Sequence, residues 1–339
     1  MIHINGAFGE GGGQIVRTSL ALSLVTGKPF RIENIRAGRK KPGLRRQHLT
    51  ALNAAARIGG AGVQGNTIGA QAFTFEPGKV RPGRYHFGIG SAGSCILVLQ
   101  TVLPALLRAD GHSELILEGG THNPYAPPFH FLQKSFLPLL NRMGATVSAK
   151  LQRPGFYPAG GGKIQVSIRP ASKLIPIELL ERGRIRRRAA LAMVSNLPLS
   201  IALRELKVVA QELKWSQQVL TTGEIKNAKG PGNILVIAIE SDALTEVFTG
   251  FGQRGIRAEE VAGHTVKRVQ EYLEYNVPVG PCLADQLLIP LAMAGGGRYR
   301  TLSPTRHTTT NIAIIKQFLE VEIRLSPYEN HQWELRISQ

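Results

Sequence analysis

The sequence predicts an α+β fold in which one large domain of three repeated units carries a smaller inserted α/β module. Three observations predict it. The 38 glycines cluster beside apolar runs, which is typical of turns between packed elements. The order helix, strand, polar loop, helix, strands recurs three times along the chain. Between Glu181 and Tyr275 this order gives way to a different alternation of strands and helices.

The first unit begins with an apolar helix over 14–26, which ends at Gly27 because glycine readily takes the left-handed conformation of a helix end. A strand over 30–35 and a basic loop over 36–43 follow. Apolar residues then recur at helical spacing and predict a second helix over 44–58.

The second and third units repeat this order, and repeated units usually pack against one another to share a core. We therefore expect their corresponding loops to fall in related places. The second unit is expected to contain a helix over 93–107, a strand over 114–117, a loop over 119–128, a helix ending near 142 and strands over 146–151 and 163–168. The third is expected to contain a helix over 283–294, a strand over 299–302, a loop over 303–308, a helix ending near 319 and strands over 321–325 and 333–337.

The intervening stretch is interpreted as an inserted α/β module. Its edges are a basic run that starts at Arg182 and the Pro-Val-Gly-Pro segment over 278–281. The expected division is a large domain over 1–180 and 278–339 and an inserted domain over 181–277. The module is expected to contain strands over 189–194 and 234–239, helices over 199–213 and 257–272, and a possible strand near Val219.

Composition excludes several classes of protein. Hydrophobic residues make up 43% and charged residues 19%, so the chain can bury a sizeable core and is not mainly disordered. The apolar run over 95–107 is too short to span a membrane and is interrupted by Gln100. The first six residues lack the basic and apolar regions of a signal peptide. Cys95 and Cys282 form neither a disulfide framework nor a zinc motif, so we expect reduced thiols in a cytoplasmic protein.

The charge balance favours a polyanionic partner. There are 41 Lys and Arg residues against 23 Asp and Glu, and 41 − 23 = +18. Such a surplus is typical of proteins that bind nucleic acid, nucleotides or anionic membranes. The cations concentrate over 36–46 and 182–188, which makes a merely soluble basic surface a weaker explanation.

Two common nucleotide and hydrolase motifs are excluded. No P-loop is present, and no Gly-x-Ser-x-Gly surrounds a serine. The segment over 88–93 matches Gly-x-Gly-x-x-Gly, but a dinucleotide fold needs an acidic residue after the next strand, and Asp110 precedes it. This segment is better interpreted as a glycine turn that admits a phosphate to a helix N-terminus.

Two side chains suit phosphate chemistry. His307 lies in an expected loop beside Arg306 and three threonines, where a neutral imidazole could attack phosphorus while the guanidinium stabilises its charge. A surface or core histidine is the alternative. Glu10 lies within the glycine cluster over 9–13, where it could either compensate a helix N-terminus or bind a metal beside phosphate oxygens.

Motifs along nearly the whole chain resemble those of the RNA 3′-terminal phosphate cyclases. They include Gly9-Glu10-Gly11-Gly12-Gly13, Gly155-Phe156-Tyr157-Pro158-Ala159-Gly160-Gly161-Gly162 and Leu283-Ala284-Asp285-Gln286, together with the segments over 35–39, 41–44, 47–51, 90–95 and 99–105.

The resemblance implies a fold and a reaction. The fold is three βαβαββ-type units, like the C-terminal domain of a bacterial translation initiation factor, with a thioredoxin-like insertion. The reaction is that of a ligase which converts an RNA 3′-phosphate to a 2′,3′-cyclic phosphate while ATP becomes AMP and pyrophosphate. It passes through a histidine–AMP adduct and an RNA–adenylate anhydride. The implied substrates are ATP and RNA with a 3′-terminal phosphate, and the implied cofactor is Mg²⁺ or Mn²⁺.

The resemblance also implies roles for individual residues. His307 matches the nucleophile and Glu10 the metal-binding carboxylate. The positions that match the adenylate pocket are Gln100, Pro127, Phe248, Cys282, Leu283, Ala284, Asp285 and Gln286. Those that match the anion-binding group at the RNA terminus are Arg17, Arg36, Arg39, Gln47 and His48, and Arg45 lies near His48 on one helical face.

Two positions depart from the family pattern, and two other functions compete. Cys282 stands where several relatives carry an aromatic residue, and His122 stands where their loop often carries aspartate. A non-catalytic cyclase-like RNA-binding protein of ribosome assembly would share the fold but lack the nucleophile, whereas His307 is present here. An enolpyruvyl transferase is the third alternative, and the nucleotide-site pattern disfavours it.

Overall fold

Three of the four β-sheets share one strand order. The structure is a computed structural model that describes residues 1–329 and 331–339. In each of these sheets the first strand pairs parallel with the second, the second antiparallel with the fourth, and the fourth antiparallel with the third. The first sheet contains β1 (Ile2–Asn5), β2 (Phe30–Glu33), β3 (Gly62–Gln64) and β4 (Phe73–Glu76); the second contains β5 (Arg84–Gly88), β6 (Ser113–Gly119), β7 (Thr146–Arg153) and β8 (Gly162–Arg169); the third contains β9 (Glu178–Leu179), β14 (Gly296–Thr301), β15 (Glu322–Pro327) and β16 (Trp333–Ser338).

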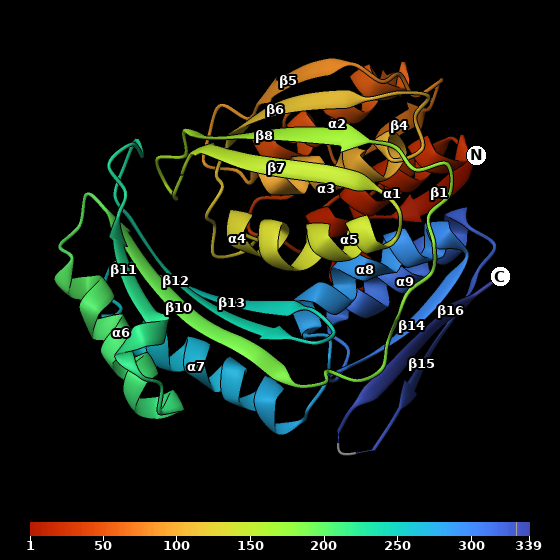
Figure 1. Ribbon diagram of the computed structural model, residues 1–339. Helices are drawn as coiled ribbons and strands as arrows, with labels where there is room; N and C mark the ends of the chain where they lie inside the picture. The colour runs from red at the N-terminus through yellow and green to blue at the C-terminus, as the bar shows by residue number, and fades with distance from the viewer. Residues whose placement is uncertain (330) are drawn as a thin grey trace.

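The helices that follow these strands pack together between the sheets (Figure 1). They are α1 (Gly13–Thr26), α2 (Arg46–Gly59), α3 (Cys95–Leu106), α8 (Pro281–Ala294), α9 (Arg306–Phe318) and a segment made of α4 (Phe129–Phe131), the π-helix η1 (Leu132–Phe136) and α5 (Leu137–Arg142). Helix α1 contacts α2, α3 and α9, so it is buried on nearly every side. This explains why its sequence is apolar around most of its circumference.

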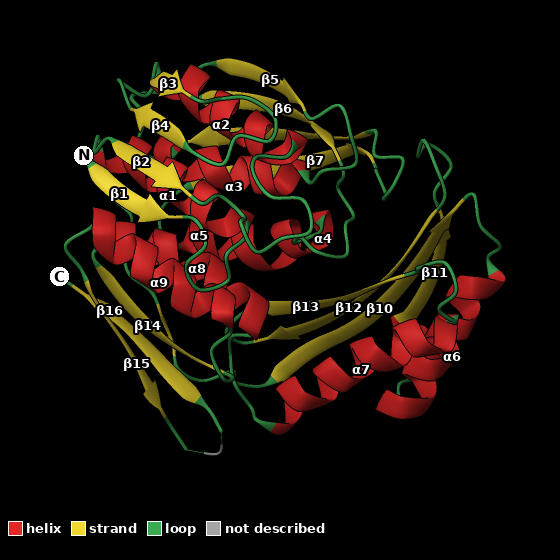
Figure 2. Cartoon of the chain, turned by 180° about the vertical axis from the view of Figure 1, so that it is seen from behind, coloured by secondary structure: helices red, strands yellow, loops and turns green. Residues whose placement is uncertain are grey.

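A fourth sheet forms the core of the inserted region. It has the order β11-β10-β12-β13 and contains β10 (Ile185–Ser195), β11 (Leu220–Glu224), β12 (Gly232–Ser241) and β13 (Thr245–Phe251). Helices α6 (Ser200–Leu213) and α7 (Ala258–Glu274) cover the face turned away from the rest of the molecule (Figure 2).

Both faces of β12 are buried. Leu235, Ile237 and Ile239 pack under α6 and α7, whereas Ile234 and Val236 join the core of the larger region. A strand buried on both faces reads as a continuous apolar run, as this one does.

The structure corrects several sequence-based boundaries. Helix α9 begins at Arg306 because the Thr305 hydroxyl accepts a hydrogen bond from the Thr308 amide at 3.2 Å, so His307 lies in the first helical turn and not in a loop. The strand expected near Val219 begins at Leu220. Sequence patterns did not predict the short strands β1, β3, β4 and β9, nor β13, whose two buried faces remove the alternation that marks a strand.

Among the described helices, none combines the length and the apolar character needed to cross a membrane.

A buried carboxyl in the inserted region leads to a stability prediction. Glu205 on α6 is fully buried, and one of its oxygens accepts a hydrogen bond from Asn233 Nδ2 at 2.9 Å. Within the described chain its other oxygen, like Asn233 Oδ1, has no hydrogen-bond partner. Burial raises the pKa of Glu205 to about 7. A neutral carboxyl could donate to Asn233 Oδ1 and satisfy both oxygens.

The stabilisation by this proton is therefore present at acidic pH and is lost as pH rises through about 7. We expect Glu205→Gln, which stays neutral, to be more stable than the wild type at pH 8 by up to about 3 kcal/mol. The difference should be less than half as large at pH 5.5, because the stabilisation is lost between the ordinary pKa of 4.5 and about 7. Urea unfolding at both pH values measures it, with exposed Glu212→Gln on the same helix as the control. An equal difference at both pH values would contradict the prediction.

Candidate active site

Three helix N-termini meet at His307. The side chain lies in the first turn of α9, Gln14 lies in the first turn of α1 and Asp285 lies one turn further along, in the second turn of α8. Gln14 Nε2 donates to Asp285 Oδ1 at 2.7 Å, and Gln14 Oε1 lies 2.7 Å from His307 Nδ1. The positive ends of three helix dipoles therefore face one region, which favours anionic ligands there.

These contacts select one tautomer of His307. A carboxylate only accepts hydrogen bonds, so the Gln14 amide must turn its NH₂ to Asp285 and its oxygen to His307. An oxygen at that place requires a proton on His307 Nδ1. The neutral ring then carries its lone pair on Nε2, and the residue is exposed. This is the arrangement of an imidazole nucleophile.

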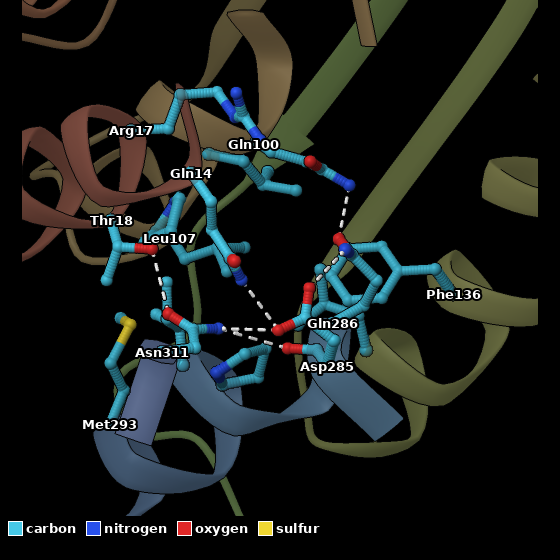
Figure 3. Close-up of a pocket in the computed structure, with 15 residues that line it drawn as sticks. Gln14, Arg17, Thr18, Gln100, Leu107, Phe136, Asp285, Gln286, Met293 and Asn311 are labelled. Carbon is cyan, nitrogen blue, oxygen red and sulfur yellow. Dashed lines mark hydrogen bonds between the residues drawn. The ribbon is translucent and has the colours of Figure 1, made fainter. Parts of the chain in front are cut away.

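Asp285 is held by further hydrogen bonds (Figure 3). Asn311 Nδ2 donates to Asp285 Oδ1 at 3.2 Å, and Thr18 Oγ1 donates to Asn311 Oδ1 at 2.8 Å. Burial raises the pKa of Asp285, while His307 and Arg17 act in the opposite direction. Gln14, Thr18 and Asn311 were not predicted. Their signal in the sequence was polar residues on helix faces that are otherwise apolar.

A cavity of about 60 Å³ lies beside this network, between α1, α3, α8, α9 and the segment of η1 and α5. Its polar lining includes Gln100, Asp285 and Gln286, three of the residues predicted for the adenylate pocket (Figure 3). Gln100 Nε2 donates to Gln286 Oε1. The cavity is far smaller than the several hundred Å³ typical of a small-molecule site, so a nucleotide would have to lie across its mouth.

The other predicted adenylate residues lie in different settings. Leu283 and Ala284 are buried, so only their backbone could meet a ligand. Cys282 is exposed at the start of α8. Pro127 lies half-buried in the loop before α4 and does not line the cavity.

Phe248 does not fit the predicted stacking role. Its ring is buried in the core under α7 and packs on Tyr272, with ring centroids 5.3 Å apart. Successive side chains of a strand point to opposite faces, so Val247 and the partly exposed Phe251 face the larger region instead. Phe248 is therefore buried in the core formed with α7 and does not offer a free ring face to a nucleotide.

Glu10 is tied to the same helix turn as His307. Its amide donates to Thr310 Oγ1 at 2.9 Å, and that hydroxyl donates to Arg306 O at 2.6 Å. Gly9 makes this approach possible, since its φ is +57° and a Cβ there would collide with the Thr310 hydroxyl. The glycine cluster thus brings a carboxylate close to the N-terminus of α9.

The Glu10 carboxylate fits a divalent cation. One oxygen accepts a hydrogen bond from Arg39 Nη2, and Oε2 is buried without a partner within the described chain. Those residues contain no cluster of three or more His, Cys, Asp or Glu side chains arranged to hold a metal. A single free carboxylate oxygen suits Mg²⁺ or Mn²⁺ whose other ligands are phosphate oxygens and water.

Two of the predicted anion-binding residues converge at Gly13, where a Cβ would collide with His48 Nε2 and lie 3.0 Å from Arg17 Nη1. His48 Nδ1 accepts a hydrogen bond from the Arg45 amide at 3.1 Å, which leaves the ring proton on Nε2. Burial and the neighbouring cations lower the pKa of His48 to about 3, so it is a neutral donor. Burial lowers the pKa of Arg17 to about 10, and it stays charged at neutral pH.

The side chains of Arg36 and Gln47 form hydrogen bonds with backbone groups. Arg36 Nη1 donates to Lys41 O at 2.7 Å and to Gly43 O at 3.0 Å, which shapes the basic loop. Burial lowers the pKa of Arg36. Gln47 Oε1 accepts a hydrogen bond from the Ser94 amide at 2.6 Å and so fastens the start of α3. In this structure both residues support the loops around the predicted anion-binding residues.

Known proteins are similar to this chain over most of its length. The family model described as "RNA 3′-terminal phosphate cyclase" matches residues 8–325. A protein of that name from Ectopseudomonas mendocina is 51% identical over 95% of this chain and 94% of its own length. One from Koribacter versatilis is 49% identical over 97% of this chain and 93% of its own.

The solved structure of an enolpyruvyl transferase, NikO from Streptomyces tendae, matches 98% of this chain and 47% of its own chain at 12% sequence identity. Its TM-score of 0.39 is too low for any conclusion about fold or function. The relatives and the family model confirm the resemblance found in the motifs. The chain belongs to the RNA 3′-terminal phosphate cyclase family.

Proposed function

We propose that this protein converts the 3′-terminal phosphate of RNA into a 2′,3′-cyclic phosphodiester, with ATP converted to AMP and pyrophosphate. The observation that carries the proposal is the chain from Asp285 through Gln14 to His307, which leaves the Nε2 lone pair exposed at the N-terminus of α9. A non-catalytic RNA-binding relative has no need of such a chain. An enolpyruvyl transfer has no use for a nucleophilic imidazole.

The reaction needs an activated phosphate, because a phosphomonoester dianion is a poor electrophile and hydroxide is a poor leaving group. His307 Nε2 attacks the α-phosphorus of ATP, the new N–P bond forms, and the bond to pyrophosphate breaks. An oxygen of the RNA 3′-phosphate then attacks the same phosphorus and displaces His307. Finally the 2′-hydroxyl attacks the 3′-phosphorus, loses its proton and displaces AMP. Dividing the displacement in this way is covalent catalysis.

We assign the adenylate to the mouth of the cavity at Gln100, Asp285 and Gln286, with the first turn of α8 from Cys282 to Ala284 and the loop at Pro127 as its borders. Gln100 and Gln286 bond to each other and could exchange that bond for contacts to a nucleotide.

We assign Glu10 Oε2 to a divalent cation, which would neutralise the charge of the leaving pyrophosphate. Arg17, His48 and Arg39 would bind the RNA 3′-phosphate. A neutral His48 suits this role because it donates from Nε2 at every pH above about 3.

The architecture supports a finer reading of the fold. The shared strand order of three sheets is that of three βαβαββ units, and we propose that they form one domain over 1–180 and 278–339. The sheet of β10 to β13 with α6 and α7 would be a thioredoxin-like domain over 181–277. Both cysteines are free thiols, which agrees with a cytoplasmic location.

The proposal is tested by incubating the protein with α-labelled ATP and a divalent metal, followed by denaturing electrophoresis. Acid-labile label on the protein, chased by 3′-phosphate RNA into cyclic product and AMP, is the expected result. An unlabelled protein that still binds RNA would favour the non-catalytic alternative.

Arg39 is expected to act after adenylylation. Arg39→Ala removes a cation from the anion site but leaves His307 and its hydrogen bonds in place. The histidine–AMP adduct should form at nearly the wild-type rate, whereas AMP transfer to RNA should slow by about 10- to 100-fold. Discrimination between 3′-phosphate and 3′-hydroxyl ends should fall with it. Single-turnover chase of preformed adduct measures both, with exposed Lys40→Ala as the control. A normal chase in Arg39→Ala would contradict this role and would show that the basic loop is only a solvated surface.

A further inference from the structure

We infer that Tyr157 is a stacking platform for a base upstream of the RNA 3′ end, on a surface that leads away from the anion site. The inference rests on the proposed function. It concerns the loop over 153–161, to which neither ATP nor the terminal phosphate has been assigned. Tyr157 is 70% exposed, and its hydroxyl makes no hydrogen bond within residues 1–329 and 331–339.

The loop is held rigid from both sides. The neighbouring Phe156 ring is buried, stacks on His122 with centroids 5.2 Å apart, and fills the space that Gly232 of the inserted region leaves open. The Gly160 amide donates to Phe156 O at 2.6 Å. An exposed aromatic ring on a fixed loop binds a base with little loss of conformational entropy.

Contiguous contacts connect this loop to the anion site. Arg46 follows Arg45, whose amide is bonded to His48, and Arg46 Nη1 donates to Gly90 O at 2.7 Å. Next to Gly90, the Ser91 carbonyl lies against Gly160, where a Cβ would be 2.8 Å from it. These contacts place Arg46 and the glycine turn between His48 and the Tyr157 loop.

The charge along this surface suits a phosphodiester backbone. Arg45 and Arg46 are exposed, and neither forms an ion pair in the part of the chain that the structure describes. Lys229 of the inserted region is also exposed, and its side chain packs on Gly161, which lies in the same loop as Tyr157. A track of unpaired cations with an interspersed aromatic is the pattern of proteins that bind single-stranded nucleic acid.

A second exposed aromatic lies on the adjoining loop. Tyr125 is 90% exposed, and its loop is fastened to the Tyr157 loop because the Thr121 and His122 amides donate to Gly155 O at 2.9 Å and 3.1 Å. The occupant that fits these features is a single-stranded 3′ segment, since a duplex would present no exposed base faces.

The test compares Tyr157→Ala with Tyr157→Phe in full-length protein. We expect Tyr157→Ala to raise the KM for a 3′-phosphorylated hexanucleotide RNA by about 5- to 100-fold, the range for one stacked base, with kcat little changed. Tyr157→Phe should behave as the wild type because stacking needs only the ring. Tyr328→Ala, at an exposed tyrosine that directly follows the end of β15, is the matched control and should leave KM unchanged.

Abasic substitution along the RNA identifies the contact. Removing one particular upstream base should weaken RNA binding to the wild type as much as Tyr157→Ala does. The same removal should not weaken RNA binding to Tyr157→Ala any further. Unchanged KM in Tyr157→Ala, or an abasic loss that adds fully to it, would overturn the inference. Protein–AMP formation from ATP alone is measured in parallel. Its absence from the wild type would refute the proposed function, whereas its presence with a normal KM in Tyr157→Ala would refute only the platform.

Discussion

Replacing His307 with asparagine is expected to abolish protein–AMP formation and to slow cyclisation by about 10⁴-fold or more. Asparagine preserves a polar group that can face Gln14 but offers no lone pair of comparable nucleophilicity at the Nε2 position. The measurement is labelling with α-labelled ATP, together with cyclic product formation. Exposed Thr309→Ala, two residues along α9, is the control and should label normally.

The hydrogen-bond chain behind His307 yields a companion test. Gln14→Met keeps the side-chain volume but breaks the links to both His307 and Asp285, so the tautomer of the ring is no longer selected. The rate of labelling should fall while the KM for ATP changes little, because Gln14 acts through the histidine. Full labelling of the asparagine variant at position 307 would move the nucleophile elsewhere, and an unchanged rate in Gln14→Met would show that the chain is only structural.

Replacing Glu10 with glutamine is expected to slow adenylylation by roughly 10²- to 10³-fold, because departing pyrophosphate needs its charge neutralised. The substitution keeps the shape of the side chain beside Gly12, removes the negative charge and replaces one acceptor oxygen with an NH₂ group. RNA binding should change much less, because Arg17 and His48 converge at Gly13 without a hydrogen bond to Glu10, and only Arg39 of the three proposed RNA-binding residues bonds to its carboxylate.

A metal titration separates a ligand from a structural role. The Mg²⁺ or Mn²⁺ concentration at half-maximal labelling should rise in Glu10→Gln, and exposed Glu33→Gln should leave it unchanged. Equal losses in labelling and in RNA binding, with an unchanged metal requirement, would instead assign Glu10 to holding the glycine turn through Thr310.

Helical and strand periodicity predicted most of the long elements, because the spacing of apolar residues shows which face of an element is buried. The helix α2 was predicted in this way, whereas α1, which is apolar on most sides, was predicted from its apolar run and the terminating Gly27. The short strands β3 and β4 carry too few residues to show a period, and they join the first sheet only through pairing with β2. The strand β13 was missed for a different reason, because both of its faces are buried and its apolar residues do not alternate.

The same distinction between local sequence patterns and tertiary contacts applies to the functional site. Sequence by itself determined the family and the surplus of cations. It also predicted His307 as the nucleophile, Glu10 as a metal ligand and Asp285 as an adenylate-pocket residue, because local motifs carry the resemblance. Only the tertiary structure decided that Gln14 orients His307 across 293 positions of the chain, and that His48 is a neutral donor. It also decided that Phe248 points into a core. The tautomer of a histidine, the charge of a side chain and the direction in which it points depend on the groups that surround it after folding. Here those groups come from α1, α8, α9 and the inserted sheet, which are far apart along the sequence.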